Sequence, residues 1–240
     1  MRRFFPADAA RCVPTRWWVL AVLLWSSTAT ADFSYKFKLY DAAGKEAGKA
    51  RATLTHGPSG MLYKSALVQS DTLGVFMTHH AMQGNWTLER FKRRPPSVGA
   101  RSFYALFRKG GKLSAKEQTG ADKLKISATG AAADSLVVDT RDPSDYLLLL
   151  ERYGGGGGKV FLSDGGGTAE GTVADGGSVS RAVGKHSVSF TAKKVSLGSQ
   201  SGLVLYRDGV VAGVVVRNVL ALVDAVARDL EGGEPTPSAP

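Results

Sequence analysis

The chain has 240 residues, with 31 Lys and Arg against 21 Asp and Glu, which gives a formal net charge of +10. Its only cysteine is Cys12, so an intramolecular disulfide is excluded and stability must come from an ordinary hydrophobic core. A chain of this length can form one domain that buries roughly 70% of its unfolded surface.

The first 31 residues have the layout of a secretory signal peptide. A nine-residue apolar core (WWVLAVLLW) follows four basic residues, and an A-x-A pattern ends at Ala31. The apolar core is about half of the ~20 residues that a membrane-spanning helix needs. We therefore expect residues 1–31 to be removed and the protein to be periplasmic or secreted, with a membrane anchor only if this segment stays uncleaved.

Removal of this segment lowers the net charge from +10 to +7 and leaves a mature chain without cysteine. The remaining excess of Lys and Arg predicts attraction to anionic surfaces such as phospholipid headgroups or acidic polysaccharide. The alternative is that the charge serves general solubility. Nucleic acid is not an expected partner, because an exported protein rarely meets it.

Alternating polar and apolar residues predict a long series of β-strands. In FSYKFKLY, Phe33, Tyr35 and Phe37 face one side of a half-buried strand, while the serine and the lysines face the other. Turn residues such as those of DAAGK and GPSG separate it from similar segments. Further strands are expected at 47–56, 61–69, 73–82, 86–93, 102–108, 112–118, 123–128 and 136–139, as one continuing meander.

The segment DPSDYLLLLERYG predicts one short helix. Asp142 is suited to the N-cap, Pro143 to the first helical position and Gly154 to a left-handed stop. The run YLLLL is apolar on nearly all sides, so we expect this helix to be buried. The alternative is a strand, because of the same apolar run.

Strands are expected again after the glycine run, at 160–163, 168–174, 178–183 and 187–197. In LVLYRDGVVAGVVV, Asp208-Gly209 between two apolar segments predicts a hairpin with a type I′ turn. From Arg217 to Leu230 apolar residues recur at helical spacing, which predicts a C-terminal amphipathic helix. Arg217 and Asp224 argue against a transmembrane segment.

These elements predict a mainly β protein. We expect an antiparallel meander that forms an unclosed β-barrel or strongly curved sheet, with the short buried helix and the C-terminal amphipathic helix added to it. The predicted division is a signal peptide over 1–31, a single β-rich domain over 32–231 and a disordered tail over 232–240.

Known catalytic patterns are not matched. The run GGGGGKV has Tyr153 and Val160 where a phosphate-binding loop requires Gly and Ser or Thr. No G-x-S-x-G is present, and in VVDT the residue that follows is Arg141 where an aspartic protease requires Gly. We therefore predict no catalytic residue, no cofactor and a non-enzymatic role.

The segment VFMTHHAMQGNW is the strongest chemical lead. Its thioether and imidazole groups, on Met77, His79, His80 and Met82, are ligands that suit copper. In a strand, however, successive side chains point to opposite faces, so Met77 and His79 would share one face while His80 and Met82 share the other. A four-ligand site would need a tight loop here or remote ligands such as His56 or His186. Strand packing is the favoured interpretation.

Four segments resemble those of exported bacterial β-domains discussed beside the lipoprotein-carrier (LolA/LolB-like) half-barrels. They are the opening hairpin FSYKFKLYDAAGKEAGKARATL, the strand pair SFYALFRKGGKLSAKEQ, the helix and loop RDPSDYLLLLERYGGGGGKVFLSDGGG, and the closing hairpin SGLVLYRDGVVAGVVV. The resemblance implies an unclosed antiparallel barrel that wraps a helix and, by analogy of fold alone, an apolar ligand cavity. The predicted helix from Arg217 departs from that plan, because it could plug the cavity.

Three functions are therefore carried forward. The first is a non-enzymatic exported domain that binds an apolar or amphipathic ligand, such as a lipid or a lipidated partner. The second is a structural or assembly protein of the cell envelope that acts through protein–protein contacts, with an exposed edge strand for β-augmentation. The third is a periplasmic copper binder that uses the Met/His cluster.

Overall fold

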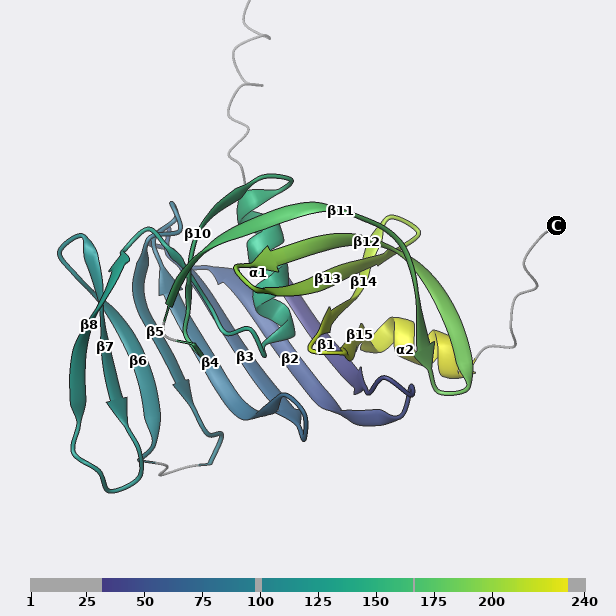
Figure 1. The fold of residues 1–240 in the computed structure, drawn as a ribbon, viewed down its shortest axis with the longest axis horizontal. Coiled ribbons are helices and arrows are strands. Elements are labelled where there is room, and N and C mark those ends of the chain that lie inside the picture. Colours follow the sequence, from purple (N-terminus) through teal and green to yellow (C-terminus); the bar gives the residue numbers. More distant parts are fainter. Residues whose placement is uncertain (1–31, 98–100, 166, 233–240) are drawn as a thin grey trace, which may run out of the picture. The chain divides into compact units, whose positions relative to one another are not determined.

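The computed structural model describes residues 32–97, 101–165 and 167–232 (Figure 1). The predicted signal peptide over 1–31 lies outside the described residues, and so does the tail predicted over 232–240 except residue 232, which is the last residue of a helix. The described elements are, in chain order, β1 (Phe33–Tyr40), β2 (Glu46–His56), β3 (Leu62–Ser70), β4 (Gly74–Met82), β5 (Leu88–Arg94), β6 (Phe103–Lys109), β7 (Lys112–Gln118), β8 (Lys125–Ala132), β9 (Leu136–Val138), α1 (Pro143–Tyr153), β10 (Gly157–Leu162), β11 (Gly167–Val183), β12 (His186–Leu197), β13 (Gln200–Arg207), β14 (Val210–Val216), β15 (Val219–Val223) and α2 (Asp224–Gly232).

The described strands form one sheet that is built from two meanders. Its order is β8-β7-β6-β5-β4-β3-β2-β1-β15-β14-β13-β12-β11-β10-β9, so the first strand pairs with the last one near the middle of the sheet. In that central pair, Phe37 lies opposite Val223 and Tyr40 lies opposite Leu220. The edges of the sheet are β8 and β9, which do not pair with each other. The predicted mainly β architecture with an unclosed sheet is confirmed.

The strand β9 corrects the prediction of one continuous antiparallel meander. It pairs with β10 in parallel, with Val137 opposite Phe161, and it does not continue from β8. Parallel neighbours need a crossover connection, and α1 lies between β9 and β10 in the chain. The predicted helix therefore supplies the crossover at this edge of the sheet.

The C-terminal helix is shorter than predicted. Arg217 and Asn218 have positive φ angles of 47° and 64° and form a turn, after which the chain enters β15. The helix α2 begins only at Asp224, so the prediction of a helix from Arg217 was wrong over its first half. The physical reason is that β15 is buried on both faces, which removes the polar alternation by which a strand is recognised.

The predicted capping of α1 is confirmed. Asp142 has an extended backbone, and its carboxylate accepts a hydrogen bond of 3.0 Å from the backbone N–H of Ser144. Pro143 opens the helix, and Gly154 ends it with a φ of 62°. The helix is buried from Pro143 to Leu149, so its first two turns are inside the domain.

Two hydrophobic cores lie on opposite faces of the C-terminal strands. The larger core joins α1 to the inward faces of both meanders. The smaller core lies under α2 and includes Leu220 and Leu222 of β15, whereas Ala221 of the same strand faces the larger core. The long strands β11 and β12 arch from one core toward the other (Figure 1), with a β-bulge between Asp175 and Gly177.

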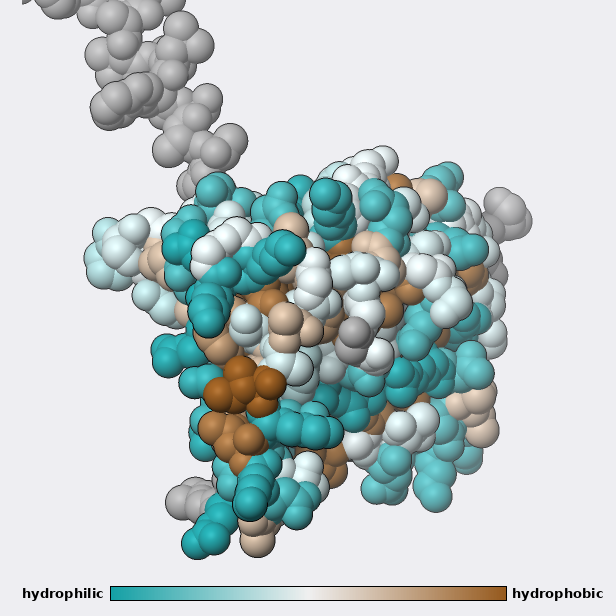
Figure 2. All heavy atoms as spheres, turned by 60° about the vertical axis from the view of Figure 1, so that its left-hand side comes forward, coloured by the Kyte–Doolittle hydropathy of each residue, from teal (hydrophilic) through white to brown (hydrophobic). Residues whose placement is uncertain are grey.

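The edge strand β8 is exposed over its first half. The backbone edge of Lys125 to Ala128 that faces away from β7 has no neighbouring strand among the described residues. Ile126 is 63% exposed, and Leu124, just before the strand, is 49% exposed. Figure 2, which brings this side of the sheet forward, shows apolar patches interrupted by hydrophilic residues.

Candidate functional site

Basic side chains cross the outer face of β1–β5. In β1, Lys36 and Lys38 point outward while Phe37 is buried in the core. Lys36 lies opposite Arg51 of β2, and Lys38 lies opposite Lys49. Because the side chains of paired residues share a face, these four cations stand close together on the outside of the sheet.

The same face continues to β5 through half-buried apolar residues. Arg51 lies opposite Leu67 of β3, Leu67 lies opposite Met77 of β4, and Met77 lies opposite Arg94 of β5. The neighbouring row contains His79 and Lys92, which also face each other. Cations and apolar side chains therefore alternate across this surface.

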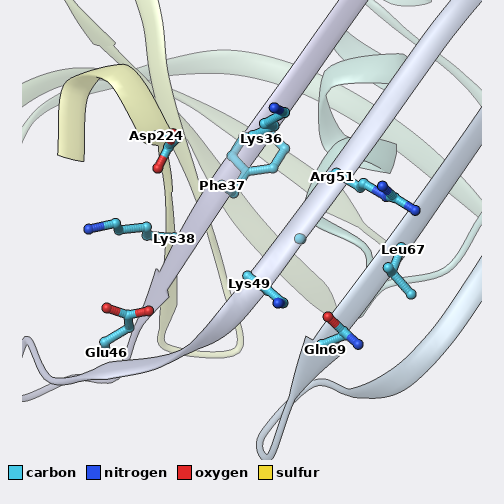
Figure 3. A pocket seen from close by; sticks show the side chains of 10 residues that line it. Lys36, Phe37, Lys38, Glu46, Lys49, Arg51, Leu67, Gln69 and Asp224 are labelled. Carbon is cyan, nitrogen blue, oxygen red and sulfur yellow. The ribbon is translucent and has the colours of Figure 1, made fainter. Parts of the chain in front are cut away.

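Three adjoining hollows follow these rows. The first, of about 440 Å³, lies over β1–β3 beside the start of α2 (Figure 3). It shares Lys36, Arg51 and Leu67 with the second, of about 310 Å³, which in turn shares Ser65 and His79 with the third, of about 470 Å³. We call this surface the basic groove, defined by Lys36, Lys38, Lys49, Arg51, Leu67, Met77, His79, Arg90, Lys92 and Arg94.

The positive charge of the basic groove is balanced only at its α2 end. There Lys38 donates to Glu231 over 2.5 Å, and Glu46 and Asp224 line the first hollow. Lys36 and Arg51 form no ion pair with another described residue, and neither do the cations of β5 in the groove. The field in the groove is therefore most positive toward β5.

The pKa of His79 is lowered in part by the positive charges of the groove. Partial burial is the largest cause that lowers its pKa, and Arg94 and Lys92 lower it further. Adjacent to the groove, the Lys92 ammonium lies 5.2 Å from the centre of the Phe103 ring. An anion bound here would meet several cations and a few apolar side chains, but no opposing carboxylate outside the α2 end.

The predicted split of the Met/His segment between two faces is confirmed. In β4, Met77 and His79 are half-buried on the outer face, whereas His80 and Met82 are buried on the inner face. The strand alone therefore does not bring these four residues into one cluster. Among residues 32–97, 101–165 and 167–232, no group of three or more His, Cys, Asp or Glu side chains is placed to hold a metal ion.

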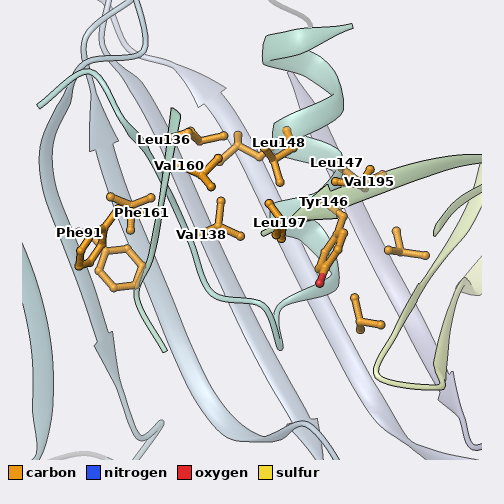
Figure 4. Close-up of a cluster of buried hydrophobic side chains, with 14 of the residues drawn as sticks. Phe91, Leu136, Val138, Tyr146, Leu147, Leu148, Val160, Phe161, Val195 and Leu197 are labelled. Carbon is orange, nitrogen blue, oxygen red and sulfur yellow. The ribbon is translucent and has the colours of Figure 1, made fainter. Parts of the chain in front are cut away.

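The inner face is filled by α1 and by apolar side chains. Figure 4 shows Tyr146, Leu147 and Leu148 of α1 among residues of β9, β10 and β12. The packing is close, because a Cβ atom on Gly202 of β13 would lie 2.5 Å from a ring carbon of Tyr146. The helix α1 therefore packs directly against the inner face of the sheet at β13.

A buried polar network lies at the N-terminus of α1. Lys64 of β3 points inward, and its ammonium donates to Asp142 over 2.7 Å and to Asp145 over 2.5 Å. The side chain of Lys64 is fully buried, and the side chains of both aspartates are at most 1% exposed. Beside it, Asp139 accepts from Arg93 and Arg141, whose charges hold the pKa of this buried carboxyl below its ordinary value although burial opposes them.

Sequence reasoning did not predict either of these sites. The signal for the network is Lys64 itself, since it occupies an inward position in the alternating segment MLYKSALVQ, between the buried Leu62 and Ala66. The signal for the basic groove is the excess of Lys and Arg over Asp and Glu in the sequence. Its location depends on the register of five strands, which the sequence pattern does not contain.

Comparisons with known proteins add little detail. No model of a protein family matches the sequence, and no curated protein matches it. Among solved structures, the chain is similar to a β-barrel-like protein of the domain of unknown function DUF1849 from Brucella abortus. The two are 11% identical with a TM-score of 0.39, over 80% of this chain and 95% of that one.

No helix among the described residues has both the length and the apolar character required to cross a membrane. The polar clusters of the described residues include the fully buried network at Lys64, the partly buried group of Thr140, Asp164 and Arg217, and the open, cationic basic groove. The arrangement of the groove is suited to binding an anion.

Proposed function

We propose that the protein is a non-enzymatic exported domain of the cell envelope that binds anionic phospholipid at the basic groove. The observation that carries this proposal is the continuous outer surface on which Lys36, Arg51 and Arg94 alternate with Leu67 and Met77 and form no ion pair with described residues. Cations suit the phosphate of a headgroup, and the apolar side chains between them suit the acyl boundary.

This proposal places the lipid on the outer face, where the resemblance to lipoprotein carriers had implied an interior cavity. The helix α1 lies in the larger core on the inner face of the sheet, and Tyr146 packs closely against Gly202 of β13. Export and a location in the envelope rest on the predicted signal peptide and remain part of the proposal.

Sedimentation with vesicles tests the proposal. We expect the mature protein to sediment with vesicles of phosphatidylglycerol and phosphatidylcholine, and not with vesicles of phosphatidylcholine alone. Each groove cation contributes about 1 kcal/mol near an anionic surface, so the double variant Lys36→Glu/Arg51→Glu should bind at least ~30-fold more weakly.

The matched control is Lys193→Glu/Lys194→Glu, which makes the same change in net charge at two exposed positions of β12 that do not line the groove. If the control and the groove variant lose the same affinity, then only the total charge matters and the groove is not the site. If the parent binds both kinds of vesicle equally, the anionic headgroup is not recognised.

The exposed edge of β8 favours a second candidate function, in which the protein assembles with another envelope protein. Lys125 to Ala128 present an open backbone edge next to the exposed Ile126, and a partner strand could add to it by β-augmentation. Lysines at an edge also protect a strand against unwanted pairing, so the edge needs a direct test.

A photoreactive residue at Ser127 provides that test. For the assembly function we expect one discrete cross-linked protein in the native host, and Ala128→Pro should abolish the cross-link because proline distorts the open edge. The same photoreactive residue at Lys185 serves as the control position. A cross-link pattern that is identical at both positions would count against β8 as an assembly edge.

A further inference from the structure

The buried contact between Lys64 and Asp145 brings an amine and a carboxyl group together without water. Lys64 Nζ lies 2.5 Å from Asp145 Oδ1, and both side chains are fully buried. The two residues come from β3 and from the first turn of α1, and the fold holds them together over 81 positions of sequence. Holding two reacting groups in place in this way removes the entropic cost of bringing them together.

A third group is placed to move a proton. Asp142 Oδ2 accepts a hydrogen bond of 2.7 Å from the Lys64 ammonium. It is therefore in place to accept a proton from Lys64, which an amine must lose before it can act as a nucleophile. Its own position is fixed, because Thr78 donates to Oδ2 over 3.0 Å and the Ser144 hydroxyl donates to Oδ1 over 2.6 Å.

The carboxyl group of Asp145 is also held and polarised. Its Oδ2 accepts the backbone N–H of Asp139 over 2.7 Å, which leaves Oδ1 on the side of the lysine. The His80 ring is fully buried, 3.6 Å from Oδ1, and neither of its nitrogens has a hydrogen-bond partner. Within the described residues, this polar pocket therefore contains one imidazole that the ion pairs do not use.

Burying the charged forms of Asp142, Asp145 and Lys64 away from water costs desolvation free energy. Burial raises the pKa of Asp145 to about 7 although Lys64 opposes the shift, and this favours the protonated carboxyl that the condensation needs. Burial alone would lower the pKa of Lys64, but Asp142 and Asp145 raise it above its ordinary value. A neutral amide at this place would remove the buried charges that carry the cost.

We propose that Lys64 and Asp145 condense to an intramolecular isopeptide bond, with Asp142 as the proton acceptor. The ammonium first gives one proton to Asp142, and the neutral Nζ then attacks Cγ of the protonated Asp145. The Nζ–Cγ bond forms while charge develops on Oδ2, where the N–H of Asp139 stabilises it.

The step is balanced without a co-reactant. A second proton leaves Nζ with the Oδ1 hydroxyl, the Cγ–Oδ1 bond breaks, and one water departs. The first proton stays on Asp142, so the ion pair becomes a neutral amide beside a neutral carboxyl. Because the resting lysine is protonated, the reaction requires the proton transfer first and should be slow after folding.

The consequence is a covalent link between β3 and the N-terminus of α1. The chain has no cysteine after Cys12, so the mature domain has no disulfide to hold α1 in place. The isopeptide bond would close a loop between residues 64 and 145 and would restrict the unfolded chain as a disulfide does.

Intact-mass measurement of the full-length mature protein, purified from its native host, tests the proposal. We expect a mass about 18 Da, one water, below that of the sequence, and a branched peptide after digestion that joins the segments around Lys64 and Asp145. Lys64→Met should show the full sequence mass, and Asp142→Asn should accumulate the link several-fold more slowly after refolding.

A dehydrated Asp208-Gly209 would also lose one water, so the branched peptide and the Lys64→Met result are needed to assign the loss. A folded parent protein that keeps its full mass after days at neutral pH would overturn the proposal, and so would a loss located elsewhere in the chain. Circular dichroism of each sample establishes that it is folded, and the parent result decides the question even if a variant fails to fold.

Discussion

The substitution Leu148→Ala tests whether α1 is a permanent part of the core or a plug that opens for a ligand. Leu148 lies in the larger hydrophobic core and has no exposed surface (Figure 4). The change removes three carbon groups, each of which contributes about 0.8 kcal/mol when it is buried, so the transfer contribution is about 2.4 kcal/mol. The cavity that remains raises the expected loss to about 3–5 kcal/mol.

Urea unfolding followed by circular dichroism measures this loss. For a domain of this size the free energy of unfolding falls by roughly 2–3 kcal/mol per molar urea, so the midpoint should move down by about 1–2.5 M with an unchanged slope. Leu124→Ala is the matched control, because Leu124 is 49% exposed and its truncation should cost less than about 0.5 kcal/mol.

The result that would refute the reasoning is a loss below about 1 kcal/mol for Leu148→Ala. Binding of an apolar fluorescent probe to the folded parent protein, in the absence of urea, would strengthen this refutation. Both results together would mean that α1 leaves the sheet readily, and the interior would then again be a candidate cavity for a lipid. A large loss without probe binding supports the outer groove as the binding surface.

Three further predictions concern the groove, the packing of α1 and the buried His80. The pKa of His79, which burial, Arg94 and Lys92 lower, should rise when soluble short-chain phosphatidylglycerol binds, as followed by NMR of the imidazole, and an unchanged pKa at saturation would place the ligand elsewhere. Gly202→Ala should cost about 1–3 kcal/mol in urea unfolding because its Cβ would meet Tyr146, whereas Gly111→Ala, with open space around it, should be nearly neutral. Burial, with Lys64 as a smaller cause, lowers the pKa of His80 well below 6.5, so below that pH the folded-state imidazole binds fewer protons than the unfolded-state one. The contribution of His80 to stability should be full above pH 6.5 and be lost as the pH decreases, and the difference in stability between the parent and His80→Gln should change with pH in this way. An equal pH dependence in both proteins would show that His80 does not contribute to it.

Local features of the fold could be predicted because they depend on neighbouring residues. The alternation of Phe33, Tyr35 and Phe37 with polar residues predicted β1, and Asp142, Pro143 and Gly154 predicted both ends of α1. Asp208-Gly209 does form the predicted turn with positive φ angles of 53° and 79°. In each case a short-range steric or hydrogen-bonding preference decides the structure.

The remaining features depend on contacts between distant residues. The residues of β15 have helical spacing as well as strand propensity, and only their burial between two cores selects the strand. The pairing of β1 with β15 and the parallel pairing of β9 cannot be read from alternation, which gives the faces of a strand but not its neighbours. The contacts of Lys64 with Asp142 and Asp145 are likewise a product of the tertiary fold.

The pairing of the first strand with the last one makes completion of the sheet depend on the full length of the chain. Until Val219–Val223 is available, β1 and β14 both have an open edge, with the buried Leu39 and Val214 beside them. Contacts over such a sequence distance form slowly. A chain that ends before Val219 would expose these two edges and would be recognisable as incomplete by proteases and chaperones. The topology thus couples the stability of the domain to the completeness of its synthesis.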